Sequence, residues 1–328
     1  MKIIKKLVLF VIFSAIISCG GTGGSSYVHT PYDGNAREKM REFVIKLSEY
    51  AETKKPGFII IPQNGQAVID EYDETTYVGE YGKDEYFNAI DGTGREDLYY
   101  GYDTDNVATS EADTAEMVEL CNRFKIAVKT VLVTDYCWDR SKVDDSYTKN
   151  NNKGYISFAA PARELNEVPE GHPKGVNSNN ITSLSDAKNF LYIIGANDSA
   201  TITKIKETNY DLIIMDAYKE DGTIFTSSEI EELKTKKNGG SRLVIAYMSI
   251  GEAENYRYYW NNSWKPGSPE YICEENPSWA GNYKVKYWMD KWQNIIYGDE
   301  KSYLKKIIDA GFDGVYLDII DAYEYFEE

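Results

Sequence analysis

Residues 315–318 read Val-Tyr-Leu-Asp, a short apolar run that ends in an acid, and the recurrence of this pattern decides the fold. Short apolar runs of this kind are typical of buried strands. Five other runs end in the same way: FNAID at Asp91, TVLVTD at Asp135, DLIIMD at Asp216, LVIAYMSIGE at Glu252 and KYWMD at Asp290. In a barrel of alternating parallel strands and helices, the end where the strands exit carries the active site. The pattern therefore predicts a ring of acids around such a site.

The alternation of strands and helices predicts an α/β fold, a (β/α)8 TIM barrel formed by a single domain over residues 35–328. Nine strand candidates compete for eight places. GYISFAA at 154–160 is the most expendable, because it has no exit acid and a long polar loop over 163–185 follows it. The amphipathic helix at 36–53 can replace a last helix, so that the first strand, at 58–62, pairs with the last.

The first residues predict export rather than fold. Lysines at 2, 5 and 6 precede an apolar stretch over 7–17 and then Cys19, which resembles a bacterial lipoprotein signal. We expect a signal peptide at 1–18, lipid on Cys19, a flexible tether at 19–34 and anchorage to the cell envelope, at the outer membrane or cell surface. The alternative is an ordinary secretory signal with an incidental cysteine.

Charge and composition narrow the chemistry. The net charge of −17 predicts repulsion from nucleic acid, and we expect a monomer without cofactor or metal. The chain has two histidines, His29 in the tether and His172 in a polar loop, which disfavours Ser-His-Asp catalysis and histidine-ligated metals. Abundant carboxylates and 28 tyrosines instead favour glycoside hydrolysis, with aromatic rings beside acids for binding sugars.

Several longer motifs carry a family resemblance. They are FIIIPQNG (58–65), NAIDGTGREDLYYGYD (88–103), NFLYIIG (189–195), SRLVIAYMSIGEAENYRYYW (241–260), PSWAGNYKVKYW (277–288) and AGFDGVYLDIIDAYEYF (310–326). Together they resemble the endo-α-1,4-polygalactosaminidase family, glycoside hydrolase family 114, from about residue 57 to the end. The resemblance implies a TIM barrel. It also implies a circular permutation, because the first two motifs follow the last one in fungal-type members.

Glycoside cleavage needs a proton donor and an ionised carboxylate. The resemblance implies that Asp318 is the nucleophile and that Glu96 is the acid/base, with Asp91 as a rival at the predicted strand exit. Whether the reaction retains or inverts the anomeric configuration stays open. Residues expected to bind substrate are Asn64, Asp91, Asp135, Asp216, Glu252, Glu254, Asp290, Tyr316 and Asp321, and Arg257 also matches a family position.

The resulting hypothesis is an anchored hydrolase of an α-linked polysaccharide that contains galactosamine. Two alternatives remain at this point. One is a surface lipoprotein that binds carbohydrate without cleaving it, and the other is a hydrolase of a different cell-wall or host glycan.

Overall fold

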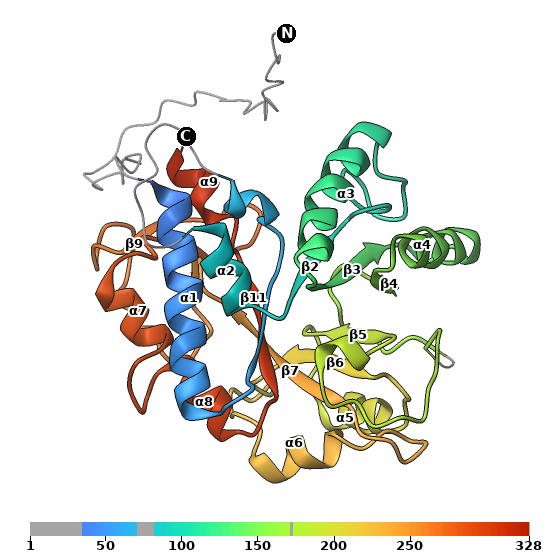
Figure 1. Cartoon of the computed structure of the whole chain (residues 1–328). Helices are drawn as coiled ribbons and strands as arrows, with labels where there is room; N and C mark the ends of the chain where they lie inside the picture. Colours follow the sequence, from blue (N-terminus) through green and yellow to red (C-terminus); the bar gives the residue numbers. More distant parts are fainter. Residues whose placement is uncertain (1–34, 71–81, 171–172, 328) are drawn as a thin grey trace, which may run out of the picture.

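The computed structural model describes residues 35–70, 82–170 and 173–327. The predicted signal peptide, the tether with Cys19 and His29, and His172 lie outside these residues. Helices and strands alternate along most of the described chain (Figure 1). None of the described helices combines the length and the apolar character needed to cross a bilayer.

Eight parallel strands form two sheets. The first sheet has the order β1-β11-β7-β6-β5 and the second has the order β2-β3-β4. Their bounds are β1 Ile59–Pro62, β2 Gly92–Glu96, β3 Thr130–Tyr136, β4 Ile156–Ala160, β5 Phe190–Ile193, β6 Leu212–Asp216, β7 Leu243–Ser249 and β11 Gly314–Asp318. The α/β architecture is compatible with a TIM-like glycoside hydrolase.

The ladders of the described residues do not close into one continuous barrel. The sheets nevertheless approach each other at β1 and β2, where the amide of Asn64 donates to the Gly94 carbonyl over 2.9 Å. A parallel bridge joins Gln63 to Gly94 at the same point. On the other side, the rings of Phe158 in β4 and Phe190 in β5 lie 5.8 Å apart.

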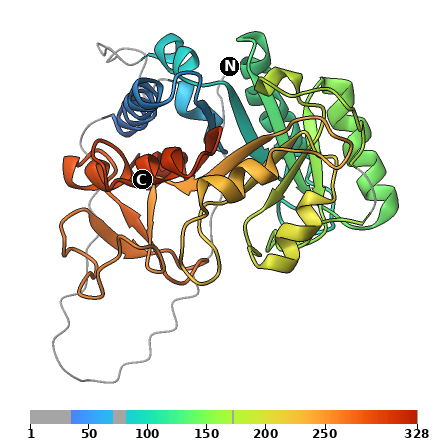
Figure 2. The same cartoon turned by 90° about the horizontal axis from the view of Figure 1, so that it is seen from below.

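Helices cover the outside of these strands (Figures 1 and 2). They are α1 Ala36–Lys54, α2 Lys83–Ala89, α3 Glu111–Ile126, α4 Arg140–Lys153, α5 Ser199–Lys206, α6 Ser227–Leu233, α7 Asp290–Ile296, α8 Tyr303–Asp309 and α9 Ala322–Glu327. Short 3-10 turns occupy Gln66–Ile69 and Leu184–Asp186.

The predicted pairing of the first strand with the last is confirmed. Strand β1 runs parallel to β11, with Ile60 beside Val315 and Pro62 beside Leu317. Helix α1 begins at the Asn35 cap, whose side chain accepts from the amide of Glu38 over 3.0 Å. It packs against α8 and α9, so the helix that precedes the first strand lies beside the last helices of the chain.

Two strand predictions are wrong. FNAID begins inside helix α2 (Lys83–Ala89), and the strand is the following GTGRE, so Asp91 lies just before β2 rather than at an exit. Glycines usually weaken a strand. Here Gly94 is required, because a Cβ at this position would stand 1.8 Å from the Tyr316 hydroxyl. GYISFAA is also not expendable, since β4 pairs with β3.

KYWMD is the third wrong strand prediction. Asp290 is the first residue of α7, and the nearby strand is β10, Asn282–Val285. Strand β10 joins β8, Glu252–Glu254, and β9, Ile272–Glu275, in a small antiparallel sheet. This sheet is separate from the parallel strands and is formed by the chain segment between β7 and α7.

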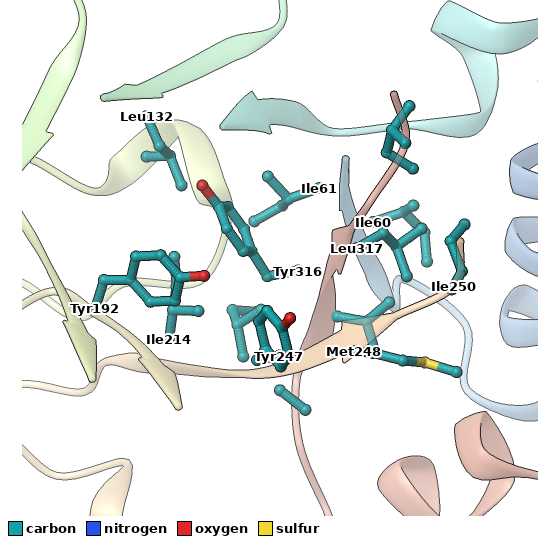
Figure 3. Close-up of a cluster of buried hydrophobic side chains, with 14 of the residues drawn as sticks. Ile60, Ile61, Leu132, Tyr192, Ile214, Tyr247, Met248, Ile250, Tyr316 and Leu317 are labelled. Atoms are coloured by element: carbon teal, nitrogen blue, oxygen red, sulfur yellow. The ribbon is translucent and has the colours of Figure 1, made fainter. Parts of the chain in front are cut away.

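The inner faces of the strands are apolar with a tyrosine layer near the carboxyl end. Ile61, Leu132 and Ile214 are fully buried in this core (Figure 3). Tyr192 and Tyr316 make an edge contact with ring centroids 5.2 Å apart. Since side chains alternate along a strand, Tyr316 and Asp318 point to the same side of β11. The tyrosines therefore form the floor beneath the acids.

Candidate active site

A cavity of about 480 Å³ opens where the parallel strands end. The residues that line it come from the ends of strands of both sheets and from the loops that follow them. They include Gln63, Asn64, Glu96, Tyr136, Arg163, Tyr192, Asp216, Tyr247, Arg257, Trp279, Asp318 and Asp321. The structure thus brings together five of the predicted site residues: Glu96, Asp318, Asn64, Asp216 and Asp321.

Glu96 is the last residue of β2 and is held from two sides. Asn64 donates through Nδ2 to one carboxylate oxygen over 2.9 Å, and its Oδ1 accepts from the Glu96 amide over 3.0 Å. The hydroxyl of Tyr136 donates to the other carboxylate oxygen. The guanidinium of Arg163 lies over the Tyr136 ring at 3.9 Å from its centre and pairs with Asp97 at 2.9 Å. These contacts fix the Glu96 carboxylate in one orientation.

Asp318 is the last residue of β11. Its Oδ2 accepts from the Tyr247 hydroxyl over 2.7 Å and its Oδ1 accepts from the amide of Ile319 over 2.8 Å. Burial raises the pKa of Asp318 to about 8, and the negative charge of Glu96 acts in the same direction. The two carboxylates therefore interact electrostatically within one cavity, and this interaction favours the protonated form of Asp318.

A buried ion cluster borders the cavity on the β6 side. Arg257 pairs with Asp216 over 2.8 Å and with Glu254 over 2.7 Å, and the side chains of Arg257 and Glu254 are almost fully buried. The Tyr256 hydroxyl also donates to Glu254 over 2.5 Å. Burial raises the pKa of Asp216, and Arg257 opposes this shift. Glu254 thus lies behind Arg257 and does not line the cavity itself.

Tyr316 and Asp321 take different positions around the acids. Tyr316 is fully buried, and its hydroxyl has no hydrogen-bond partner among the described residues. It lies below the cavity rather than in its lining. Asp321 follows β11 and borders both the main cavity and a neighbouring one. Burial raises the pKa of Asp321, whereas Arg95 lowers it.

Four predicted substrate-binding acids lie elsewhere. Asp91 accepts from the amide of Ile60 over 2.8 Å at the opposite, amino-terminal end of the strands. Asp135 is fully buried and accepts from Ser146 over 2.6 Å and from the amide of Tyr99 over 2.8 Å. These bonds give both acids a structural role. The position of Asp91 also removes the reason for which it rivalled Glu96, a strand exit.

The remaining two acids, Glu252 and Asp290, lie in β8 and at the start of α7. Glu252 is buried and accepts from Asn276 over 2.9 Å in the antiparallel sheet. Burial raises its pKa. Asp290 is exposed in the first turn of α7, where a carboxylate is favoured by the helix dipole. Neither residue lines the cavity.

Sequence reasoning missed several contributors to the site. Tyr136 and Tyr247 orient the two acids, and Arg163 reaches the cavity from the long loop after β4. The positions of the tyrosines offered a signal, since each lies on an apolar run that ends near an acid. Arg163 offered none, because its contact depends on how the loop folds back.

No group of three or more His, Cys, Asp or Glu side chains within residues 35–70, 82–170 and 173–327 is arranged to hold a metal ion. The cysteines of the same ranges, Cys121, Cys137 and Cys273, are buried free thiols. The polar chemistry of the cavity therefore comes from carboxylates, phenols, amides and two arginines.

Comparison with known proteins indicates the class of enzyme to which this cavity corresponds. Residues 170–328 match the family model of glycoside hydrolase family GH114. This segment carries Asp216, Arg257 and Asp318, whereas Glu96 and Asn64 precede it. The match supports a glycoside hydrolase, in agreement with the paired carboxylates of the cavity.

The curated relatives are themselves uncharacterized. An uncharacterized protein of Methanocaldococcus jannaschii is 44% identical over 154 residues, which are 46% of this chain and 43% of the relative. An uncharacterized protein of Thermotoga maritima is 39% identical over 140 residues, or 43% of this chain and 41% of the relative. The chain thus matches less than half the length of either relative.

Proposed function

We propose that this protein is a glycoside hydrolase whose reacting carboxylates are Asp318 and Glu96. The observation that carries the proposal is that both acids end parallel strands and line one cavity, each with a tyrosine hydroxyl bound to it. We further propose that the eight parallel strands and their helices form one TIM-type barrel domain. The bridge between β1 and β2 and the ring contact between β4 and β5 support this proposal.

In the proposed reaction, an oxygen of Asp318 attacks the anomeric carbon while Glu96 gives its proton to the glycosidic oxygen. The carbon–oxygen bond breaks, one sugar chain leaves as an alcohol, and the other remains as an ester of Asp318. A water molecule then gives a proton to Glu96 and its hydroxyl to the anomeric carbon, which frees Asp318. Attack requires the ionised form of Asp318, which burial and the charge of Glu96 disfavour by raising its pKa.

The separation of the two carboxylates distinguishes this retaining course from an inverting one. Retaining enzymes hold the carboxyl groups about 5–5.5 Å apart and inverting enzymes about 6.5–9.5 Å apart. Trapping with a 5-fluoro glycosyl fluoride followed by peptide mapping tests the assignment. We expect a glycosyl ester on Asp318. A label on Glu96 would exchange the two roles, and inversion of the product would exclude the ester.

For the substrate we propose an α-linked polysaccharide that contains galactosamine. The net charge of −17 supports a cationic polymer, and so do the acids around the cavity. The test is product release from galactosaminogalactan, chitosan and peptidoglycan by the wild type, Asp318→Asn and Glu96→Gln. We expect release from the first polymer only, and at least a 100-fold loss in either variant. Binding without release, unchanged in Asp318→Asn, would indicate a carbohydrate-binding protein instead.

We also propose that lipid on Cys19 anchors the protein to the cell envelope. Support comes from the start of the sequence, where lysines at 2, 5 and 6 are followed by the apolar stretch over 7–17 and then by Cys19. Growth with radiolabelled palmitate is expected to label the wild type and not Cys19→Ala. Equal labelling of both proteins would refute the anchor.

A further inference from the structure

Two further cavities adjoin the cavity that holds Glu96 and Asp318. A cavity of about 450 Å³ shares Asn64, Glu96 and Asp321 with it, and another of about 230 Å³ shares Asp216, Tyr256 and Arg257. The first lies over the loops after β1 and β2, and the second over those after β5 and β6. Since β11 and β7 separate these strand pairs in the sheet order, the two side cavities flank the acids. The three cavities are thus neighbours with shared lining residues, and together they are called the groove here.

Exposed aromatic side chains gather along this groove. Among the described residues, five large aromatic side chains are more than a third exposed: Tyr102, Trp138, Tyr256, Tyr258 and Trp279. Four of them line the groove. Tyr102 lines the cavity over β2, Trp279 the central cavity and Tyr256 the junction toward β6, with Tyr258 beyond it. Trp138 lines none of the three cavities.

These rings differ in exposure from the tyrosines that orient the acids. The tyrosines that orient the acids are almost fully buried, whereas Tyr256 is 62% exposed and Trp279 is 57% exposed. The indole of Trp279 has no side-chain hydrogen bond or ring contact to any described residue. Exposed apolar area in a polar groove marks a binding surface. Flat rings that border carboxylates match the apolar faces and the hydroxyl edges of sugars.

We propose that Tyr102, Trp279 and Tyr256 are stacking platforms that hold consecutive sugar rings of one polysaccharide on both sides of Glu96 and Asp318. This inference rests on the proposed function for its ligand class and adds the residues that bind the chain. The groove then takes an oligosaccharide better than a single sugar, because only a longer chain reaches Tyr102 and Tyr256 at once.

The test measures binding apart from cleavage. In the Asp318→Asn background, affinity electrophoresis is run in gels with galactosaminogalactan, chitosan or peptidoglycan glycan strands, and affinity is measured for oligosaccharides of two to eight units of the retained polymer. We expect affinity to rise with length. Trp279→Ala, Tyr102→Ala and Tyr256→Ala are each expected to weaken binding of the longest chain roughly 2- to 12-fold, the range for an aromatic contact.

The matched control is Trp138→Ala, which removes an exposed tryptophan outside the groove. It is expected to leave affinity unchanged, and Trp279→Phe is expected to keep part of the binding. No retardation by any of the polymers, affinity independent of length, or an equal loss in Trp138→Ala would overturn the proposal. If binding follows the expected pattern but the wild type releases no product, the groove stands and the proposed hydrolysis fails.

Discussion

Tyr247 donates a 2.7 Å hydrogen bond to Asp318 from the neighbouring strand. The register of β7 and β11 places Tyr247 beside Tyr316 and Asp318 beside Ser249, so the phenol reaches two positions along the partner strand. This bond stabilises the Asp318 anion and lowers its pKa against the opposing effects of burial and of Glu96. Tyr247 therefore limits how far the protonated form of Asp318 is favoured.

Tyr247→Phe is expected to raise the pKa of Asp318 above its value of about 8, because the anion loses a donor. The measurement is an NMR titration of carbon-13-labelled aspartate carboxyls, which needs no substrate. Tyr192→Phe is the control, since this inner hydroxyl donates to Gln63 over 3.0 Å and not to an acid. A downward shift in Tyr247→Phe, or an equal shift in both variants, would contradict the assignment.

The raised pKa of Asp318 also predicts how stability depends on pH. The folded protein holds this proton up to about pH 8, whereas an ordinary aspartate, with a pKa of 3.8, loses it earlier. The folded state binds more protons between these values, so the contribution of Asp318 is fully present below about pH 4 and is lost as pH rises to about 8.

Asp318→Asn removes this dependence. We expect the variant to gain on the wild type by as much as a few kcal/mol between pH 5 and pH 8.5, on the order of 1.36 kcal/mol per unit of pKa difference. Urea unfolding at both pH values measures the gain. Glu119→Gln, at an exposed acid of α3 outside the pair, serves as the comparison. If the unfolding free energies of Asp318→Asn and the wild type differed by the same amount at both pH values, the pKa of Asp318 would not be raised.

Arg257→Met is expected to cost about 3–5 kcal/mol of unfolding free energy, because it leaves the buried carboxylates of Asp216 and Glu254 without an opposite charge. Lys206→Met breaks the exposed pair with Glu232 and is expected to cost no more than about 1 kcal/mol. Urea unfolding at neutral pH compares the two. If the two variants lost similar amounts of unfolding free energy, burial would not be what makes the loss of Arg257 costly.

Gly94→Ala tests the close approach of β2 to Tyr316. The added Cβ would stand 1.8 Å from the hydroxyl and 2.4 Å from the adjoining ring carbon, so Tyr316 must move and β2 with it. We expect a loss of several kcal/mol or failure to fold, because overpacking alone costs about 1–3 kcal/mol. The double variant Gly94→Ala/Tyr316→Leu is expected to recover part of this loss in thermal unfolding. If the double variant recovered no stability, the clash of the added Cβ would not be with Tyr316.

The sequence predicted the fold class where strands are apolar and end in acids. LVIAYMS and GVYLD follow the rule, and the pairing of the last strand with the first was predicted correctly. The direct pairing of β7 with β11 was not predicted, because KYWMD was expected to form a strand between them. The rule failed for β2, because GTGRE carries two glycines and therefore does not read as an apolar run. Gly94 is required by the close approach of Tyr316, a residue more than 200 positions away in the sequence. It failed in the opposite direction for FNAID and KYWMD, where an acid after an apolar run follows or begins a helix.

The candidate site was predictable to the same extent. Glu96, Asp318 and Asn64 meet in one cavity, as a shared strand end requires. Asp135 looked equivalent to Asp216 in sequence, yet it is satisfied by Ser146 and by backbone amides below the surface. Which acid faces solvent depends on loops that fold over the strand ends, and short-range patterns do not describe those loops.

The ion pair between Arg37 and Glu327, at 2.9 Å, joins the first described helix to the last. Both ends of the folded unit thus emerge at the same place, and the strands between them need no particular starting point. A short peptide that joined these ends would allow the backbone to be opened at another surface loop without changing any strand neighbour. We therefore expect the order in which a ribosome makes these strands to be separable from the architecture that they build.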